Sequence, residues 1–102
     1  MQATKDELEQ IMRMAAAAYT PGQVAFAMGF DKEEFNIAMT DENNPVSIAF
    51  FKGLYSAELA VRESIVTLAR NGSSPAQTLV VKLFDQTRKT LLINNGYNEG
   101  EI

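Results

Sequence analysis

An all-α fold is the class that this sequence predicts, and three observations indicate it. Residue patterns that start a helix occur at five places, Gly or Asn residues that suit a helix end follow several of the segments, and no alternating apolar pattern flanks a turn as it does in a β-hairpin. We expect five helices, over residues of about 4–18, 20–28, 31–40, 45–71 and 75–94. They predict an N-terminal three-helix helix-turn-helix unit followed by a long antiparallel helical hairpin.

The first three helices start at capping boxes. In this pattern a Ser, Thr or Asp side chain and a Glu or Gln three residues later each accept a hydrogen bond from the other's backbone N–H. The segments Thr4–Glu7, Thr20–Gln23 and Asp31–Glu34 fit it, and Gly29 provides a stop after the second helix. Residues three and four apart give the first helix one apolar face, made of Leu8, Ile11, Met12, Ala15 and Tyr19.

The fourth helix starts at Asn44-Pro45 and carries two apolar stripes. The first stripe consists of Phe50, Leu54, Ala57, Val61 and Leu68. The second consists of Ile48, Phe51, Tyr55, Leu59 and Val66. A helix that is apolar over more than half of its circumference needs partners on two sides. Gly53 within it has two interpretations, which are a close approach of another helix and a tolerated defect near the helix start.

The fifth helix starts at a Ser74–Gln77 capping box, with Pro75 in the first turn. Only Gly72-Ser73-Ser74 separates it from the fourth helix, so the two helices form an antiparallel hairpin. We expect a boundary in the polar loop 40–44, which separates a unit over 1–40 from the hairpin over 45–94, and a flexible tail over 95–102. The candidate residues for oligomerisation through the hairpin are Phe50, Phe51, Leu54, Tyr55, Val61, Leu68, Leu79, Leu83 and Phe84.

The second and third helices have the spacing of a helix-turn-helix. That motif needs a small residue where its helices cross, a turn residue four positions later and an apolar anchor six positions beyond, and Ala25, Gly29 and Phe35 meet these needs. The exposed face of the third helix is then Lys32, Glu33, Asn36 and Thr40. The alternative is a tight helical corner in which the glycine is only a C-cap.

The charge distribution opposes strong DNA binding by one copy. Residues 1–45 hold three basic and eight acidic residues, a net charge of −5, whereas residues 46–102 hold six and five, a net charge of +1. Affinity for DNA depends largely on phosphates neutralised by Lys and Arg. The candidate DNA contacts in the acidic half are Lys5, Arg13, Lys32 and Asn36. Either many copies act together or this motif contacts protein.

The composition also excludes several classes of function. The net charge of the whole chain is −4, and the chain has no His, Cys or Trp. Disulfide frameworks, thiolate metal sites and His-assisted nucleophiles are therefore excluded, and we expect no enzyme, no cofactor and no metal site. The polar, acidic N-terminus lacks the order of a signal peptide, and no apolar run reaches the roughly 20 residues of a membrane span. We expect a cytoplasmic protein.

Several of these segments together resemble a known family. They are Tyr19–Phe30 followed by Phe35, the step Phe51-Lys52-Gly53, the residues Glu58, Arg62 and Ile65, and the turn region Leu68–Gln77. Over about residues 19–90 the chain resembles the small terminase subunits of tailed bacteriophages, which are DNA-packaging proteins.

The resemblance implies a packaging adaptor. In that family the helix-turn-helix engages viral DNA, the hairpin assembles subunits into a ring, and a C-terminal segment meets the large terminase subunit, which holds the ATPase and the nuclease. Carried over, the DNA-facing positions are Gln23, Lys32, Asn36 and Thr40, with weak double-stranded DNA binding per subunit. The alternatives are a dimeric helix-turn-helix transcription regulator and a helical protein-interaction module without DNA binding.

Overall fold

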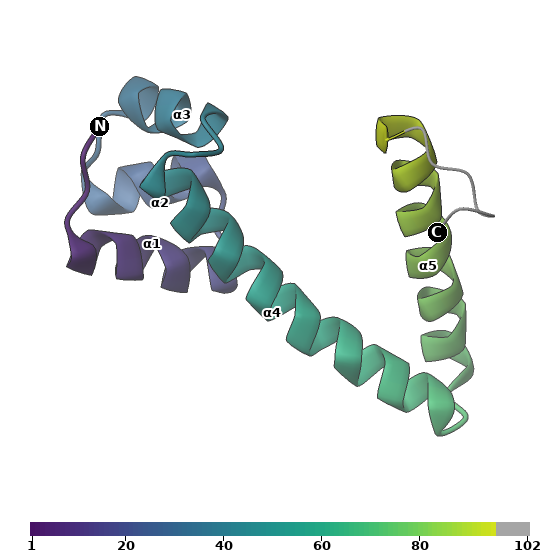
Figure 1. Ribbon diagram of the computed structural model, residues 1–102. Coiled ribbons are helices and arrows are strands. Elements are labelled where there is room, and N and C mark those ends of the chain that lie inside the picture. The colour runs from purple at the N-terminus through teal and green to yellow at the C-terminus, as the bar shows by residue number, and fades with distance from the viewer. Residues whose placement is uncertain (96–102) are drawn as a thin grey trace. The chain divides into compact units, whose positions relative to one another are not determined.

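The computed structural model describes residues 1–95, which form five α helices and no strand (Figure 1). The helices are α1 (Lys5–Ala16), α2 (Pro21–Met28), α3 (Lys32–Thr40), α4 (Pro45–Arg70) and α5 (Ser74–Asn95). The all-α prediction is confirmed, and every helix end lies within two residues of its expected place. Apart from Asn95, the predicted tail over 95–102 lies outside the described residues.

Capping contacts start the helices near the predicted residues. Thr4 Oγ1 accepts from the Glu7 N–H at 3.1 Å and Thr20 Oγ1 from the Gln23 N–H at 3.2 Å, and both reciprocal bonds are present. Asp31 Oδ1 accepts from the Glu34 N–H at 3.0 Å. Each such cap satisfies a backbone donor that the first helical turn leaves unpaired, and typically contributes about 1 kcal/mol. The three helix starts follow from these local contacts.

The start of α5 differs from the prediction by one residue. Ser73 Oγ, and not Ser74, accepts from the Ala76 N–H at 3.3 Å. The Gln77 side chain donates instead to the carbonyl oxygen of Ala69 on α4, at 3.0 Å. The capping box expected at Ser74–Gln77 is therefore wrong, because Ser74 already lies in the first helical turn and Gln77 bridges back across the hairpin turn.

Left-handed residues follow the ends of α1, α2 and α4. Gly29 has φ +72° after α2, and Gly72 has φ +99° after α4. The end of α1 has the same geometry without a glycine, because Ala18 adopts φ +70° and the Tyr19 N–H donates to the Met14 carbonyl at 3.2 Å. The first helix therefore stops before the expected residue 18.

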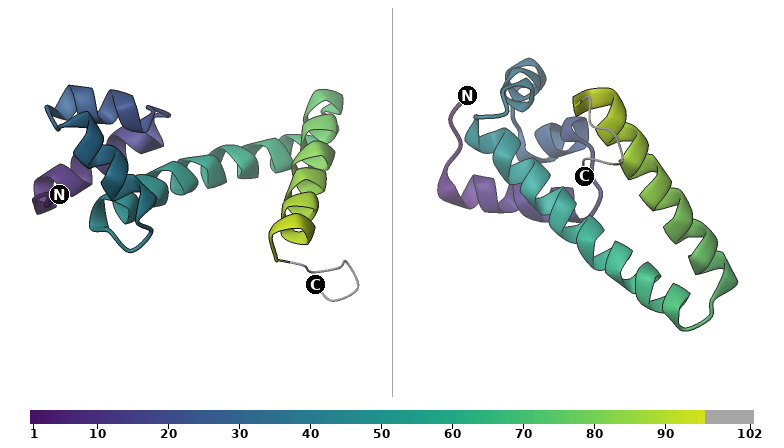
Figure 2. Two further views of the ribbon diagram at one scale, coloured as in Figure 1. Left: turned by 90° about the horizontal axis from the view of Figure 1, so that it is seen from above. Right: turned by 45° about the vertical axis from the view of Figure 1, so that its right-hand side comes forward.

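The chain divides into two compact units, residues 1–60 and the residues from Val61 onward. In the first unit, α1, α2 and α3 gather around the first turns of α4 (Figure 2). All four helices contribute to one core, whose buried residues are Ile11, Ala15, Val24, Ala25, Phe35, Ala38, Val46, Ala49 and Phe50. The units therefore divide inside α4 and not in the 40–44 loop, because the first four turns of α4 complete the N-terminal core.

Gly53 marks the closest approach between α4 and α1. It is buried, and a Cβ atom added there would lie 2.8 Å from the carbonyl carbon of Met12 and nearer still to its oxygen. Only a residue without a side chain permits this contact between two helix backbones. Of the two interpretations of this glycine, the close approach is confirmed, and the approaching helix belongs to the same chain.

The second unit consists of the last turns of α4 and of α5, and its described residues form no closed core. Ala76 is the one buried side chain among residues 61–94. A second group is half-buried at the contact between the helices: Ile65, Val66, Ala69, Val80, Leu83 and Leu91. The large apolar side chains that stay exposed are Val61, Leu68, Leu79, Val81, Phe84, Leu92 and Ile93. This hairpin alone therefore leaves most of its apolar surface in water.

Candidate nucleic-acid interface and assembly surface

The residues of the helix-turn-helix spacing meet at the corner between α2 and α3, as they would in a helix-turn-helix or in a tight helical corner. Ala25 and Phe35 are fully buried where the two helices pack, and Gly29 takes the left-handed conformation that redirects the chain. The Phe30 ring stacks on Phe35 with 5.9 Å between centroids and fills the corner. Because Phe35 and Ala38 face the core, the opposite side of α3 faces solvent.

That solvent-facing side of α3 carries three of the candidate DNA contacts. Lys32, Asn36 and Thr40 recur at four-residue steps, and all three are exposed. The Thr40 hydroxyl donates to the Ile37 carbonyl at 2.7 Å, so its oxygen lies close to the helix. Lys32 and Asn36 are the side chains on this face that can reach a phosphate or a base edge.

The remaining candidate contacts lie on α2 and α1. Gln23 is exposed, but its Oε1 accepts from the Thr20 N–H at 2.9 Å, so this side chain already closes a capping box. Lys5 and Arg13 are exposed on α1, and Arg13 Nη1 donates to Gln10 Oε1 at 3.3 Å. These three residues therefore belong to helices other than α3, and one of them has a structural task.

The two units carry charge of opposite sign. Residues 1–60 hold four basic and nine acidic residues, a net charge of −5. Residues 61–102 hold five basic and four acidic residues, a net charge of +1. Glu33 and Glu34 are exposed in the first turn of α3, where the positive end of the helix dipole favours them. Those carboxylates flank Lys32 and weaken the attraction of this face for phosphate.

The candidate assembly residues fall into three groups. Phe50 is only 4% exposed and Leu54 packs against the same core, so these two side chains stabilise their own unit. Leu83 is half-buried in the hairpin. The other candidates are exposed and available to another molecule: Phe51, Tyr55, Val61, Leu68, Leu79 and Phe84.

Other exposed apolar side chains were not among the candidates. Phe26 on α2 is 90% exposed, Ile37 on α3 is 69% exposed, and Val81 on α5 is 66% exposed. The apolar runs that contain Phe26 and Val81 conceal these residues in the sequence, because a helix with apolar residues all round gives no indication of which one faces water.

An open groove lies on the first unit, between the end of α3 and the start of α4. Its volume is about 380 Å³, and it is lined by Met39, Thr40, Glu42, Ser47, Ile48, Phe51 and Tyr55. The Phe51 and Tyr55 rings stack with 5.8 Å between centroids, and the Phe50 ring meets Phe51 edge-on at 5.6 Å. The lining of the groove therefore includes two stacked aromatic rings and one acidic side chain, that of Glu42.

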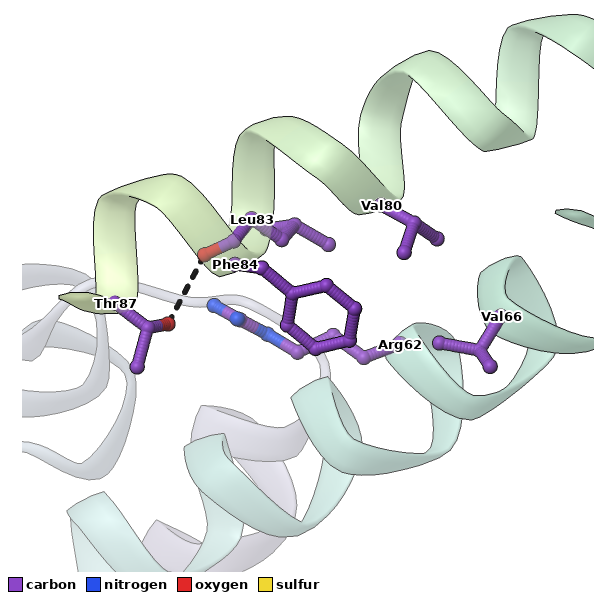
Figure 3. A pocket seen from close by; sticks show the side chains of 6 residues that line it. All are labelled: Arg62, Val66, Val80, Leu83, Phe84 and Thr87. Carbon is purple, nitrogen blue, oxygen red and sulfur yellow. Dashed lines mark hydrogen bonds between the residues drawn. The ribbon is translucent and has the colours of Figure 1, made fainter. Parts of the chain in front are cut away.

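A smaller cleft lies within the hairpin (Figure 3). Arg62 and Val66 from α4 face four residues of α5 across a volume of about 170 Å³, and the Thr87 hydroxyl donates to the Leu83 carbonyl at 3.0 Å. Small-molecule sites usually measure roughly 300–1,000 Å³. This cleft is therefore a gap between two loosely packed helices and not a ligand pocket.

Over residues 1–95, no group of three or more acidic, His or Cys side chains could hold a metal ion. In that same part of the chain, no helix has the length and apolar character needed to cross a membrane. Comparisons with protein-family models, with curated proteins and with solved structures find no match to the chain. Any assignment of function therefore depends on the surfaces described above.

Proposed function

We propose that the chain is a self-assembling helix-turn-helix adaptor for DNA, of the kind represented by the small terminase subunits. In this role a ring of copies binds viral DNA through the first unit and presents it to a large terminase subunit. The chain itself then performs no catalysis. The observation that carries the proposal is the apolar surface of the hairpin, which the packing of α5 on α4 leaves exposed.

Two helices are rarely enough for a stable core. Helices gain most of their stability from packing of an apolar face, and units of fewer than about 40 residues usually need disulfides, metals or oligomerisation. The hairpin has no cysteine, and it exposes Val81, Phe84 and Ile93 by 57% or more of their surface. Association of several copies supplies the missing packing.

Assembly also strengthens a weak DNA contact. A single α3 presents one cation, Lys32, and one amide, Asn36, within an acidic unit. When several copies are held together, each later contact forms at a high effective concentration, so the summed affinity exceeds that of one copy by orders of magnitude. DNA binding should therefore require the assembled state.

The test measures binding of the assembled protein to duplex DNA over a series of salt concentrations. Replacing Lys32 by Ala should weaken binding and flatten the salt dependence, because each phosphate contact contributes about 0.9 to the slope of log K against log salt. Lys52→Ala, which removes the same charge from α4, is the matched control and should leave the slope unchanged. Binding that does not depend on salt, or equal effects of the two variants, would contradict a DNA-contacting α3.

A protein-interaction module is the second candidate, and a specific observation favours it. The first unit carries a net charge of −5. On its surface, Phe26 is 90% exposed and Ile37 is 69% exposed. An acidic surface with exposed apolar side chains suits a basic protein partner better than it suits phosphate. If the assembled protein binds no DNA even at low salt, this candidate replaces the first.

A further inference from the structure

We infer that the groove between α3 and α4 of one copy binds the outer face of α5 from a second copy. The inference depends on the self-assembly proposed above, and it names the two surfaces that meet. Four kinds of evidence carry it: the spacing of the two faces, their exposure, their orientation within each copy and their charge.

The groove side is an apolar face of α4. Ile48, Phe51 and Tyr55 line the groove, and Leu59 continues the same face one turn further. The steps between these four residues are three, four and four, so they stay on one side of the helix over eleven residues, or about 16 Å. Each of the four side chains is exposed by 38% or more. This face has the length and the apolar character of a helix-binding groove.

The outer face of α5 has the same spacing. Val81, Phe84, Arg88 and Leu92 also follow steps of three, four and four over eleven residues. All four residues are exposed, and Phe84, at the edge of this face, also lines the cleft toward α4. Two helix faces of equal length and equal periodicity can pack side chain between side chain along their whole length.

The orientation of this face within the hairpin shows that its own α4 does not cover it. In its own chain α5 turns Ala76, Val80 and Leu83 toward α4, and these are the residues that become buried or half-buried. Because successive residues of a helix are 100° apart, the Val81–Leu92 face is rotated by about a third of a turn from that contact. Closing the hairpin would therefore bury the inner face and leave the outer one exposed.

Charge is complementary between the two surfaces. The groove is lined by one exposed acid, Glu42, and lies on a unit of net charge −5. The outer face of α5 contains Arg88, has Lys82 beside it and lies on a unit of net charge +1. Opposite potentials steer the two surfaces together and oppose pairing of two grooves or of two α5 faces.

Such a contact joins two different surfaces, so it is heterologous. Each copy that has its groove filled still offers its own α5 face to another copy. Contacts of this type continue until the rotation between neighbours closes a ring, or else they form a filament. The inferred contact therefore explains how a small chain builds an assembly larger than a dimer.

The test uses two full-length variants and the measurement of mass in solution without DNA. Tyr55→Lys places a cation in the groove, and Val81→Asp places a carboxylate on the outer face of α5. Both positions are exposed, so the helical circular dichroism spectrum should be retained. Each variant alone should associate at least about tenfold more weakly than the wild type. The matched controls, Ser56→Lys and Gln86→Asp, place the same charges elsewhere on the two helices and should assemble normally.

Mixing the two variants tests whether the contact joins two different surfaces, the groove of one copy and the α5 face of another. The mixture contains one intact groove and one intact α5 face on different chains, so it should form complexes of at least twice the 11.3 kDa of one chain. A mixture that stays monomeric would overturn the inference, and so would normal assembly of Val81→Asp alone. A wild-type chain that is itself monomeric would overturn the proposed self-assembly as well, whereas failure to bind DNA would leave this inference standing.

Discussion

At the scale of single residues, Gly53 tests how closely α1 and α4 approach. Gly53→Ala should improve helix propensity by about 1 kcal/mol, but the added methyl group meets the Met12 carbonyl group of α1. Overpacking of this kind costs about 1–3 kcal/mol and more when backbone must move, so we expect a net loss of about 2 kcal/mol in the free energy of unfolding. Urea unfolding at matched protein concentration measures it.

Gly22→Ala is the control for this substitution. Gly22 also lies in a helix, but a Cβ atom there would meet nothing within 4 Å. We expect this variant to be unchanged or more stable by up to about 1 kcal/mol. Equal effects of the two substitutions would contradict the close approach of α1 and α4.

At Ala18, unlike at Gly53, we expect a glycine to be more stable than an alanine. The left-handed backbone at φ +70° costs an alanine roughly 1–2 kcal/mol, whereas glycine adopts it freely and loses more chain entropy on folding. Ala18→Gly should therefore raise the free energy of unfolding by about 0.5 kcal/mol. Ala17, with φ −92°, is the neighbour for comparison, and Ala17→Gly should lower stability. If thermal unfolding shows Ala17→Gly to be more stable than Ala18→Gly, this would contradict the left-handed backbone of Ala18 at the end of α1.

At the scale of elements, two phenylalanines compare a buried and an exposed position at the α2–α3 corner. Phe35 is fully buried at the α2–α3 corner, and Phe26 is 90% exposed on α2. Phe35→Ala should lower the free energy of unfolding by about 3–5 kcal/mol, and Phe26→Ala should change it by less than about 0.5 kcal/mol. Chemical denaturation of the two variants compares them directly. A large effect at Phe26 would mean that another copy or another part of the chain covers this side chain in solution.

Local chemistry explains which elements the sequence predicts well. Helix starts depend on side chains within three residues of each other, so Thr4, Thr20 and Asp31 identify them from the sequence. The end of α1 is not predictable in this way, because Ala18 takes a conformation that alanine rarely adopts. At the start of α5 the cap is Ser73 and not Ser74, and the Gln77 side chain bonds to a residue eight positions earlier, a contact that a local pattern does not contain.

The candidate surfaces are less predictable than the helices. Periodicity places Phe50 and Phe51 on two neighbouring stripes of α4, but it does not say which stripe meets α1 and which meets water. That choice depends on packing between helices, which here buries Phe50 and exposes Phe51. The helix-turn-helix spacing does predict the core roles of Ala25 and Phe35, because the small residue and the anchor must pack at the crossing.

At the scale of the whole molecule, the two units should respond differently to dilution. The first unit has a core to which four helices contribute, so its folding should depend little on concentration. The hairpin has one buried side chain among its described residues. The stability of α5 should therefore depend on contacts with other copies. Hydrogen exchange at two protein concentrations should show protection that rises with concentration in α5 and stays constant in α2. Constant protection of α5 would contradict an intermolecular role for the hairpin.

Self-assembly is the claim on which the proposed function depends, because it supplies both the missing core of the hairpin and the strength of DNA binding. The most direct test is the mass of the wild-type chain by light scattering after size exclusion, at tens of micromolar and without DNA. The account predicts a defined mass of several times 11.3 kDa. A single species of 11.3 kDa at that concentration would contradict it.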